Sequence, residues 1–195
     1  ALSASAAAYN EPLQITQNTT VLARTRSGET WSALNAARFS VPAAWSGLAI
    51  TEVMYHAPGG NAYDFIELAN LGDSALDLDG LSFTSGISFA FPEGSELGAG
   101  ELLVLAADEA SFATAYPATA PFGAYEGSLA NEGESIRLED TLGNTLAFLD
   151  YEDKGRWPLG PDGFGYSLVP LRPGSAGSGP DSWRASAGAF GSPGA

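Results

Sequence analysis

Cysteine is absent from this 195-residue sequence, which excludes disulfide bonds and thiolate-bound zinc. Long apolar runs are absent too, since no stretch approaches the roughly 20 residues that a membrane-spanning helix needs. Residues 1–8 lack the basic start and long hydrophobic stretch of an export signal, so we expect the parent protein to begin further upstream. The fold must be held together by its own packed core, and we expect no membrane insertion.

Positive charge is scarce, with 8 basic residues against 23 acidic ones and a single lysine, Lys154. Residues 42–195 hold five basic and 21 acidic residues, whereas residues 1–41 contain Arg24, Arg26 and Arg38 against two glutamates. Proteins that bind duplex nucleic acid neutralise its phosphates with Lys and Arg, so we expect no nucleic-acid binding. An acidic surface suits a soluble exported protein, or one that meets cations or basic partners.

Short apolar runs, separated by clusters of Gly, Asn, Asp and Pro at intervals of about ten residues, indicate an all-β sandwich or barrel. Ile136 and Leu138 alternate with Arg137 and Glu139, which predicts a strand with one buried face. Gly143 can supply the positive φ of the hairpin turn that follows. We expect strands over residues 20–26, 36–41, 48–55, 65–70, 81–84, 87–91, 102–106, 135–139, 145–151, 166–169 and 183–185.

One helix interrupts this pattern, because Asp108 can cap a short helix that continues to Tyr116 before Pro117 ends it. Phe112 and Tyr116, four residues apart, would face the sheet. Residues 172–180 have no periodicity and are predicted to form a loop, while residues 191–195 are predicted to form a flexible tail. A change of charge and composition near residues 42–47 predicts a linker. It separates a short β segment, residues 1–41, from a larger domain, residues 48–195.

The larger domain resembles the lamin tail domain in an ordered series of motifs. They are LAITEVMYH (48–56), PGG (58–60), DFIELAN (64–70), GD (72–73), LDLDGL (76–81), FAFP (89–92), GELLVLA (100–106), LANEGE (129–134), FLDY (148–151), WP (157–158), DGFGYSL (162–168) and SWRAS (182–186). This resemblance implies an immunoglobulin-like antiparallel β-sandwich, of the type found in nuclear lamins and in large exported bacterial proteins. Leu81 departs from the pattern, since the family usually has Trp there.

The first segment is similar to the C-terminal part of the small β-domain that follows chitobiase and hexosaminidase catalytic domains. The similarity lies in AYNEPLQI (8–15), TTVLAR (19–24) and WSA (31–33). The first strands of that domain are missing from this sequence. We therefore expect residues 1–41 to be a partial domain with an unpaired sheet edge, and such edges invite pairing with another chain.

No catalytic constellation is recognisable, so we expect no enzymatic activity. His56 is the only histidine, no Gly-x-Ser-x-Gly elbow or phosphate-binding loop occurs, and no residue is proposed as catalytic. Glu52 and Glu67 lie within apolar strands, where we expect them on a solvated face or bonded to loop backbone.

Two sets of candidate binding residues remain, both near residue 150. Asp150 and Asp153 offer oxygen ligands for calcium, the one cofactor considered, although no EF-hand spacing accompanies them and a solvated turn paired with Lys154 and Arg156 is favoured. An aromatic group could stack on a sugar or form a protein contact, with core packing as the favoured alternative. It comprises Tyr151, Trp157, Phe164 and Tyr166.

These observations predict a non-catalytic structural or interaction module of a larger exported bacterial protein, located outside the cell or at its surface. Its partner would be another protein. Two alternatives stay open: self-association through open sheet edges, and carbohydrate binding as an accessory module of a glycosidase-like enzyme.

Overall fold

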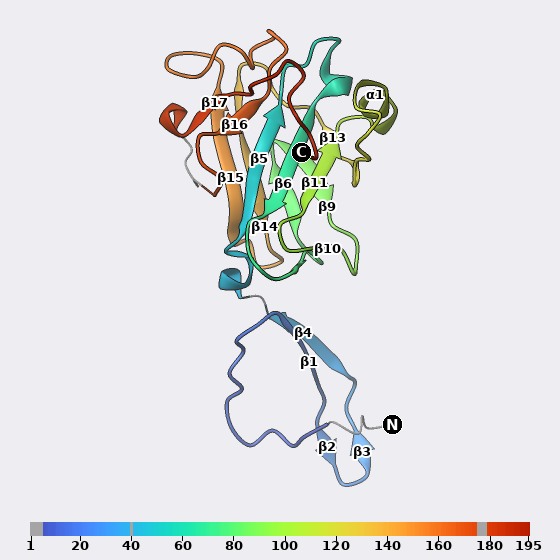
Figure 1. The fold of residues 1–195 in the computed structure, drawn as a ribbon. Helices are drawn as coiled ribbons and strands as arrows, with labels where there is room; N and C mark the ends of the chain where they lie inside the picture. Colours follow the sequence, from blue (N-terminus) through green and yellow to red (C-terminus); the bar gives the residue numbers. More distant parts are fainter. Residues whose placement is uncertain (1–5, 40, 175–178) are drawn as a thin grey trace. The chain divides into compact units, whose positions relative to one another are not determined.

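The computed structural model describes residues 6–39, 41–174 and 179–195, and the chain divides into two compact units. Unit 1 comprises Ala1–Ala44 and unit 2 comprises Trp45–Ala195 (Figure 1). In the part of the chain so described, no helix is both long and apolar enough to cross a membrane.

Unit 1 consists of two antiparallel strand pairs. β1 (Thr19–Ala23) pairs with β4 (Asn35–Phe39), and β2 (Arg26–Ser27) pairs with β3 (Thr30–Trp31). The sequence pattern predicted one strand over residues 20–26, but the Thr25 N–H and C=O instead bond to Ser32, which separates β1 from β2. Leu22 and Phe39 are exposed, and none of the described residues 6–39 is buried.

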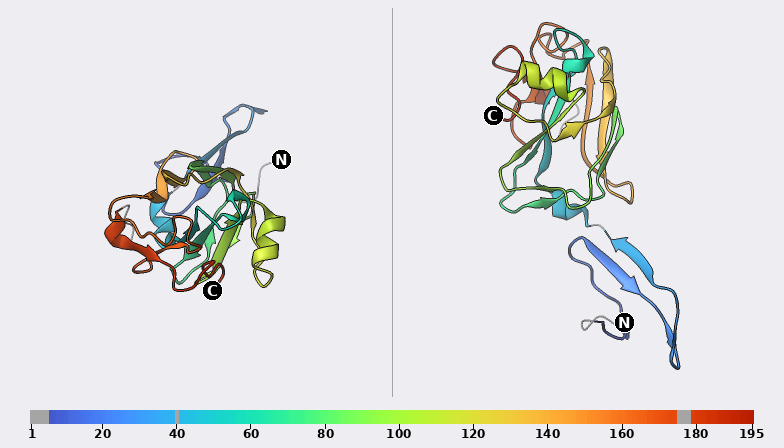
Figure 2. Two further views of the ribbon diagram at one scale, coloured as in Figure 1. Left: turned by 90° about the horizontal axis from the view of Figure 1, so that it is seen from above. Right: turned by 90° about the vertical axis from the view of Figure 1, so that its right-hand side faces the viewer.

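Unit 2 is a two-layer sandwich, as predicted, and Figure 2 shows its layers side by side in the right-hand view. One sheet has the order β12-β11-β6-β5-β16-β17 and the other has the order β13-β9-β8-β14-β15. All pairings are antiparallel except that between β11 and β12. The first sheet comprises β5 (Leu48–Met54), β6 (Phe65–Asn70), β11 (Leu102–Ala106), β12 (Gly123–Ala124), β16 (Leu168–Pro170) and β17 (Trp183–Ala185). The second comprises β8 (Ser82–Ser85), β9 (Ile87–Ala90), β13 (Glu126–Gly127), β14 (Gly133–Glu139) and β15 (Thr145–Glu152).

The sequence pattern missed the shortest strands of unit 2. β7 (Leu76–Asp77) and β10 (Glu96–Leu97) form a small separate pair, and β12 and β13 are also two residues long. Two residues cannot display a period, so only the tertiary pairing defines these strands. The longer strands agree with the predicted ranges to within a few residues, and those over residues 65–70, 102–106 and 183–185 agree at both ends.

The core lies between the two sheets and takes its side chains from both. Ile136 and Leu138 of β14 are fully buried while Arg137 and Glu139 are not, which confirms the predicted alternation. The turn after β14 also has the predicted form, with Gly143 at φ 80°. Leu81, at the position where relatives usually have Trp, is 1% exposed and belongs to this core. A smaller aliphatic side chain therefore fills that place here.

The one α-helix of the described residues, α1 (Glu109–Ala115), confirms the predicted helix and covers a second, smaller core. Asp108 caps it by accepting a 2.8 Å hydrogen bond from the Ser111 N–H. Phe112 is fully buried and meets Phe65 of β6 edge to face at 5.8 Å between ring centroids. Apolar side chains thus fix the helix on the outer face of the six-stranded sheet.

Candidate functional site

Two buried carboxylates face each other on the central strands of the six-stranded sheet. Glu52 of β5 is directly opposite Glu67 of β6, and the two residues are 2% and 3% exposed. A β-bulge between Ile50 and Glu52 interrupts the register, and the Thr51 hydroxyl donates a 2.6 Å hydrogen bond to Glu67 Oε1. Burial raises the pKa of Glu67, and the negative charge of Glu52 acts in the same direction.

The C-terminal segment, residues 190–195, supplies the hydrogen bonds that these carboxylates need. The Ser192 N–H donates to Glu52 Oε1 at 2.9 Å, and the Gly194 N–H donates to Glu67 Oε2 at 2.7 Å. The Ser167 hydroxyl also donates to Glu52. The expectation that these two glutamates bond to loop backbone is met, but the alternative of a solvated face is not. The sequence predicts a flexible tail over residues 191–195, but this segment is hydrogen-bonded to the sheet.

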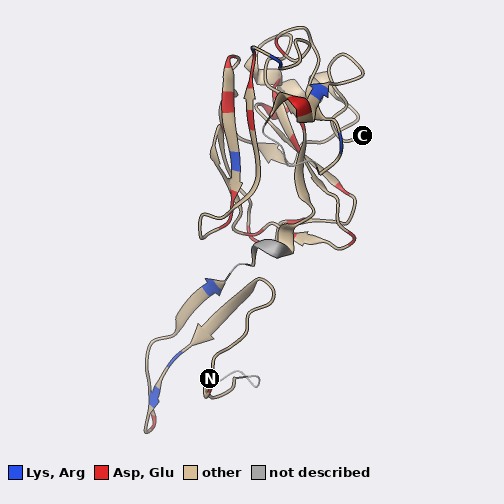
Figure 3. Cartoon of the chain, turned by 90° about the vertical axis from the view of Figure 1, so that its left-hand side faces the viewer, with Lys and Arg blue, Asp and Glu red and all other residues tan. Residues whose placement is uncertain are grey.

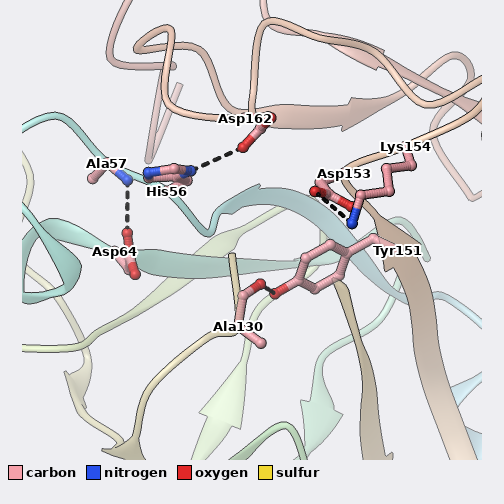
Figure 4. A network of polar contacts seen from close by, with 8 residues as sticks. All are labelled: His56, Ala57, Asp64, Ala130, Tyr151, Asp153, Lys154 and Asp162. Carbon is pink, nitrogen blue, oxygen red and sulfur yellow. Dashed lines mark hydrogen bonds and ion pairs between the residues drawn. The ribbon is translucent and has the colours of Figure 1, made fainter. Parts of the chain in front are cut away.

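A second polar group lies where β5 ends and includes the only histidine. His56 Nδ1 lies 3.0 Å from Asp162 Oδ1, and the Asp64 carboxylate accepts a 2.9 Å hydrogen bond from the Ala57 N–H (Figure 4). Asp64 is fully buried, and its second oxygen has no partner in the described structure. Burial raises the pKa of Asp64 to about 7, against the opposing effects of the Ala57 N–H and His56.

The contacts around His56 join loops of the described chain. Within the described residues the imidazole forms no hydrogen bond to a hydroxyl group. Asp162 belongs to the loop before β16, so its bond to His56 joins two distant segments of the chain. Gly163, at φ 75°, packs against the ring, where an added Cβ would lie 3.0 Å from the nearest imidazole carbon.

The two predicted calcium ligands take part in different interactions. Asp150 Oδ1 accepts hydrogen bonds from Ser135 Oγ and Arg137 Nη2, at 2.6 and 2.9 Å. Asp153 Oδ2 lies 3.4 Å from Lys154 Nζ, and its other carboxylate oxygen is buried without a partner in the described chain. Among the residues that the structure describes, no group of three His, Cys, Asp or Glu side chains has an arrangement able to hold a metal ion. The calcium hypothesis stays a prediction.

The four predicted aromatic binding residues differ widely in exposure. Tyr151 is 1% exposed, stacks on Tyr55 with ring centroids 4.4 Å apart and donates its hydroxyl to Ala130 O at 2.8 Å (Figure 4). Trp157 is 9% exposed, Tyr166 is half-buried and Phe164 is 71% exposed. Core packing, the alternative favoured from the sequence, describes Tyr151 and Trp157. A recognition surface built on this group would rely on Phe164 and the exposed part of Tyr166.

Sequence reasoning did not foresee a groove at the end of β15. It has a volume of about 630 Å³ and is lined by residues 132–135, 150–152, 154–157 and 180. The lining contains four carboxylates, from Glu132, Glu134, Asp150 and Glu152, and two basic side chains, from Lys154 and Arg156. Acidic residues also predominate over basic ones elsewhere on unit 2 (Figure 3). The acidic residues at 150–153 were the signal in the sequence, but they suggested a solvated turn, with calcium binding as the alternative, and not a groove.

The two packed sheets, with their antiparallel ladders, define an immunoglobulin-like β-sandwich. The chain belongs to the lamin tail domain family, whose sequence model matches residues 42–153. Comparison with curated proteins finds no match. The matched region includes the strands from β5 to β15 and stops before β16, β17 and the C-terminal segment that bonds to Glu52 and Glu67. The similarity of residues 1–41 to a chitobiase-associated domain stays a prediction.

Proposed function

We propose that this chain is a non-catalytic interaction module of a larger exported bacterial protein, in which it mediates contacts with other proteins or domains. Lamin tail domains are immunoglobulin-like modules without enzymatic activity, which is compatible with this role. A net charge of −15 supports a location outside the cell or at its surface, because it keeps an exposed protein soluble.

One observation supports the proposal above the others: the polar residues best suited to chemistry are occupied in holding the fold. Glu52 and Glu67 bind the C-terminal segment, and His56 binds Asp162. The lining of the acidic groove beside β15, in contrast, includes two exposed carboxylates, those of Glu132 and Glu152. A surface of this kind suits recognition of a partner more than conversion of a substrate.

Site-specific photo-crosslinking of the whole chain would test this function. A photoreactive residue at Glu152 or Phe164 should give crosslinks to discrete proteins in the envelope or secreted fraction of the source cells. Asp73 is exposed and lies outside the groove, so a photoreactive residue at this position serves as the matched control and should give no crosslinks. A chain that crosslinks to no protein from any position would contradict an interaction role.

Self-association is a second candidate because of unit 1. The β1–β4 pair has no third strand in the described residues, and two-stranded sheets are only marginally stable in water. Leu22 is 61% exposed and Phe39 is 42% exposed, so pairing with another copy would bury apolar surface. Light scattering over a concentration series should then show growing particles, whereas a monomer at every concentration would exclude assembly.

Carbohydrate binding has weaker support. Sugars stack on open aromatic faces, and the two candidate tryptophans, Trp31 and Trp157, are covered or buried. The guanidinium groups of Arg24 and Arg26 lie 4.5 and 5.4 Å from the centre of the Trp31 ring, and Trp157 is 9% exposed. Phe164 is the exposed aromatic of the predicted group. A glycan array provides the test, and hits that disappear in a Phe164→Ala variant would favour this function over protein contact.

A further inference from the structure

The outer edge of β15 is an unpaired sheet edge. β15 is the longest strand of the chain's described part, with 8 residues, and it is last in the order of its sheet. It is hydrogen-bonded to β14 on one side, and no loop backbone bonds to its other side within the described residues. Natural edges are commonly blocked by Pro, Lys or a bulge. Residues 145–152 contain neither Pro nor Lys, and the one bulge of β15, at Leu146, leaves residues 147–152 in regular register with β14.

The acidic groove lies at one end of this free edge, and Asp150, Tyr151 and Glu152 of β15 itself form part of its lining. Both basic residues of the lining are neutralised by carboxylates from outside it, Lys154 by Asp153 at 3.4 Å and Arg156 by Asp181 at 2.6 Å. The groove therefore keeps a negative potential, and a bound segment would need positive charge.

Two carboxylates of the groove are free to meet such a segment. Asp150 is already bonded to Arg137 and Ser135, but Glu132 and Glu152 are exposed and neither forms an ion pair in the described structure. Side chains on one face of an added strand recur at every second residue. A partner with basic residues at alternate positions could thus bond to the β15 backbone and still place positive charges near these glutamates.

We propose that β15 accepts an extended segment of a partner protein as an additional strand, and that lysine or arginine side chains at alternate positions of that segment bind the groove at Glu132 and Glu152. Main-chain hydrogen bonds hold the added strand, while the carboxylates select for basic sequences. This inference rests on the proposed interaction function and identifies its surface and the chemistry of its partner.

A peptide in which lysine alternates with valine provides the probe, and fluorescence anisotropy measures its binding to the whole chain. We expect saturable binding that weakens as salt is raised. Amide hydrogen exchange in β15 should slow on binding, because added main-chain hydrogen bonds protect its outward N–H groups. The Glu132→Lys/Glu152→Lys double variant should bind about tenfold more weakly, since it reverses both charges.

Three controls separate strand addition from general attraction to an acidic protein. A fully N-methylated peptide keeps the charges but cannot donate main-chain hydrogen bonds, so it should not bind. The Asp73→Lys/Glu93→Lys double variant changes the net charge equally at exposed positions outside the groove and should bind the unmodified peptide normally. Thermal unfolding of each variant verifies that the fold is intact.

The inference fails if the N-methylated peptide binds as well as the unmodified one, or if both double variants lose affinity equally. It also fails if the peptide does not bind at all. In that case, photo-crosslinks to protein partners from Phe164 would leave the interaction function in place, whereas their absence would overturn both proposals.

Discussion

Replacing Gly191 with alanine should detach the C-terminal segment from the sheet. Gly191 has φ 69°, in the left-handed region that residues with a Cβ rarely adopt. The close approach of its backbone to Glu52 Oε1 and Ser167 Oγ also leaves no room for a Cβ. Because the Ser192 N–H bonds to Glu52 and the Gly194 N–H bonds to Glu67, displacing Gly191 would disturb both contacts.

The expected destabilisation follows from these contacts. A left-handed conformation costs a residue with a side chain about 1–2 kcal/mol. Each hydrogen bond to a charged group contributes about 1.5–3 kcal/mol, so losing both would cost about 3–6 kcal/mol. The Gly191→Ala variant should therefore lower the free energy of unfolding by about 2 kcal/mol if the segment stays bound, and by up to about 6 kcal/mol if it detaches.

Chemical denaturation followed by tryptophan fluorescence measures this change, with Gly188→Ala as the matched control. Gly188 lies three positions earlier, is exposed, and has open space where a Cβ would be added. Its replacement should alter the free energy of unfolding by less than about 0.5 kcal/mol. Equal stability of the two variants would refute the conclusion that the segment is fastened to the buried carboxylates.

A double-mutant cycle with Glu52→Ala adds a sharper test. Removing the Glu52 carboxylate frees space beside residue 191, so Gly191→Ala should cost less in this background than in the native chain. Strictly additive effects would mean that the two residues do not act on each other.

Three further predictions concern the other polar residues. An acid whose folded pKa is raised loses stability as pH increases, so the free energy of unfolding should fall between about pH 4 and about pH 7 through Asp64, by at most about 4 kcal/mol. Asp64→Asn should flatten that decline in a pH series of denaturation curves, and an unchanged slope would contradict the burial argument. Tyr151→Phe should cost about 1 kcal/mol by removing the bond to a backbone carbonyl, whereas Tyr125→Phe, whose hydroxyl has no partner in the described structure, should be nearly neutral in the same assay. Calorimetric titration with millimolar Ca²⁺ tests the calcium hypothesis: the separate contacts of Asp150 and Asp153 lead us to expect no binding heat, whereas a saturable heat would support calcium binding.

The sequence alone was sufficient for the features that local periodicity and short motifs encode. Alternation around Ile136 and Leu138 identified β14, and the Asp108 cap identified α1. The ordered motifs over residues 48–186 indicated the lamin tail domain, and the family match over residues 42–153 agrees with them. These signals are readable because each depends on residues only a few positions apart.

The roles of the polar residues depended on the tertiary structure. Glu52 and Glu67 lie 15 residues apart in the sequence but face each other across two strands, and their hydrogen-bond donors come from residues 192 and 194. Nothing near either glutamate in the sequence reveals this partner. The short strands and the free edge of β15 also exist only through pairing between distant segments. Periodicity determines which face of a strand is buried, but only the folded chain decides what a buried carboxylate bonds to and which edge is left open.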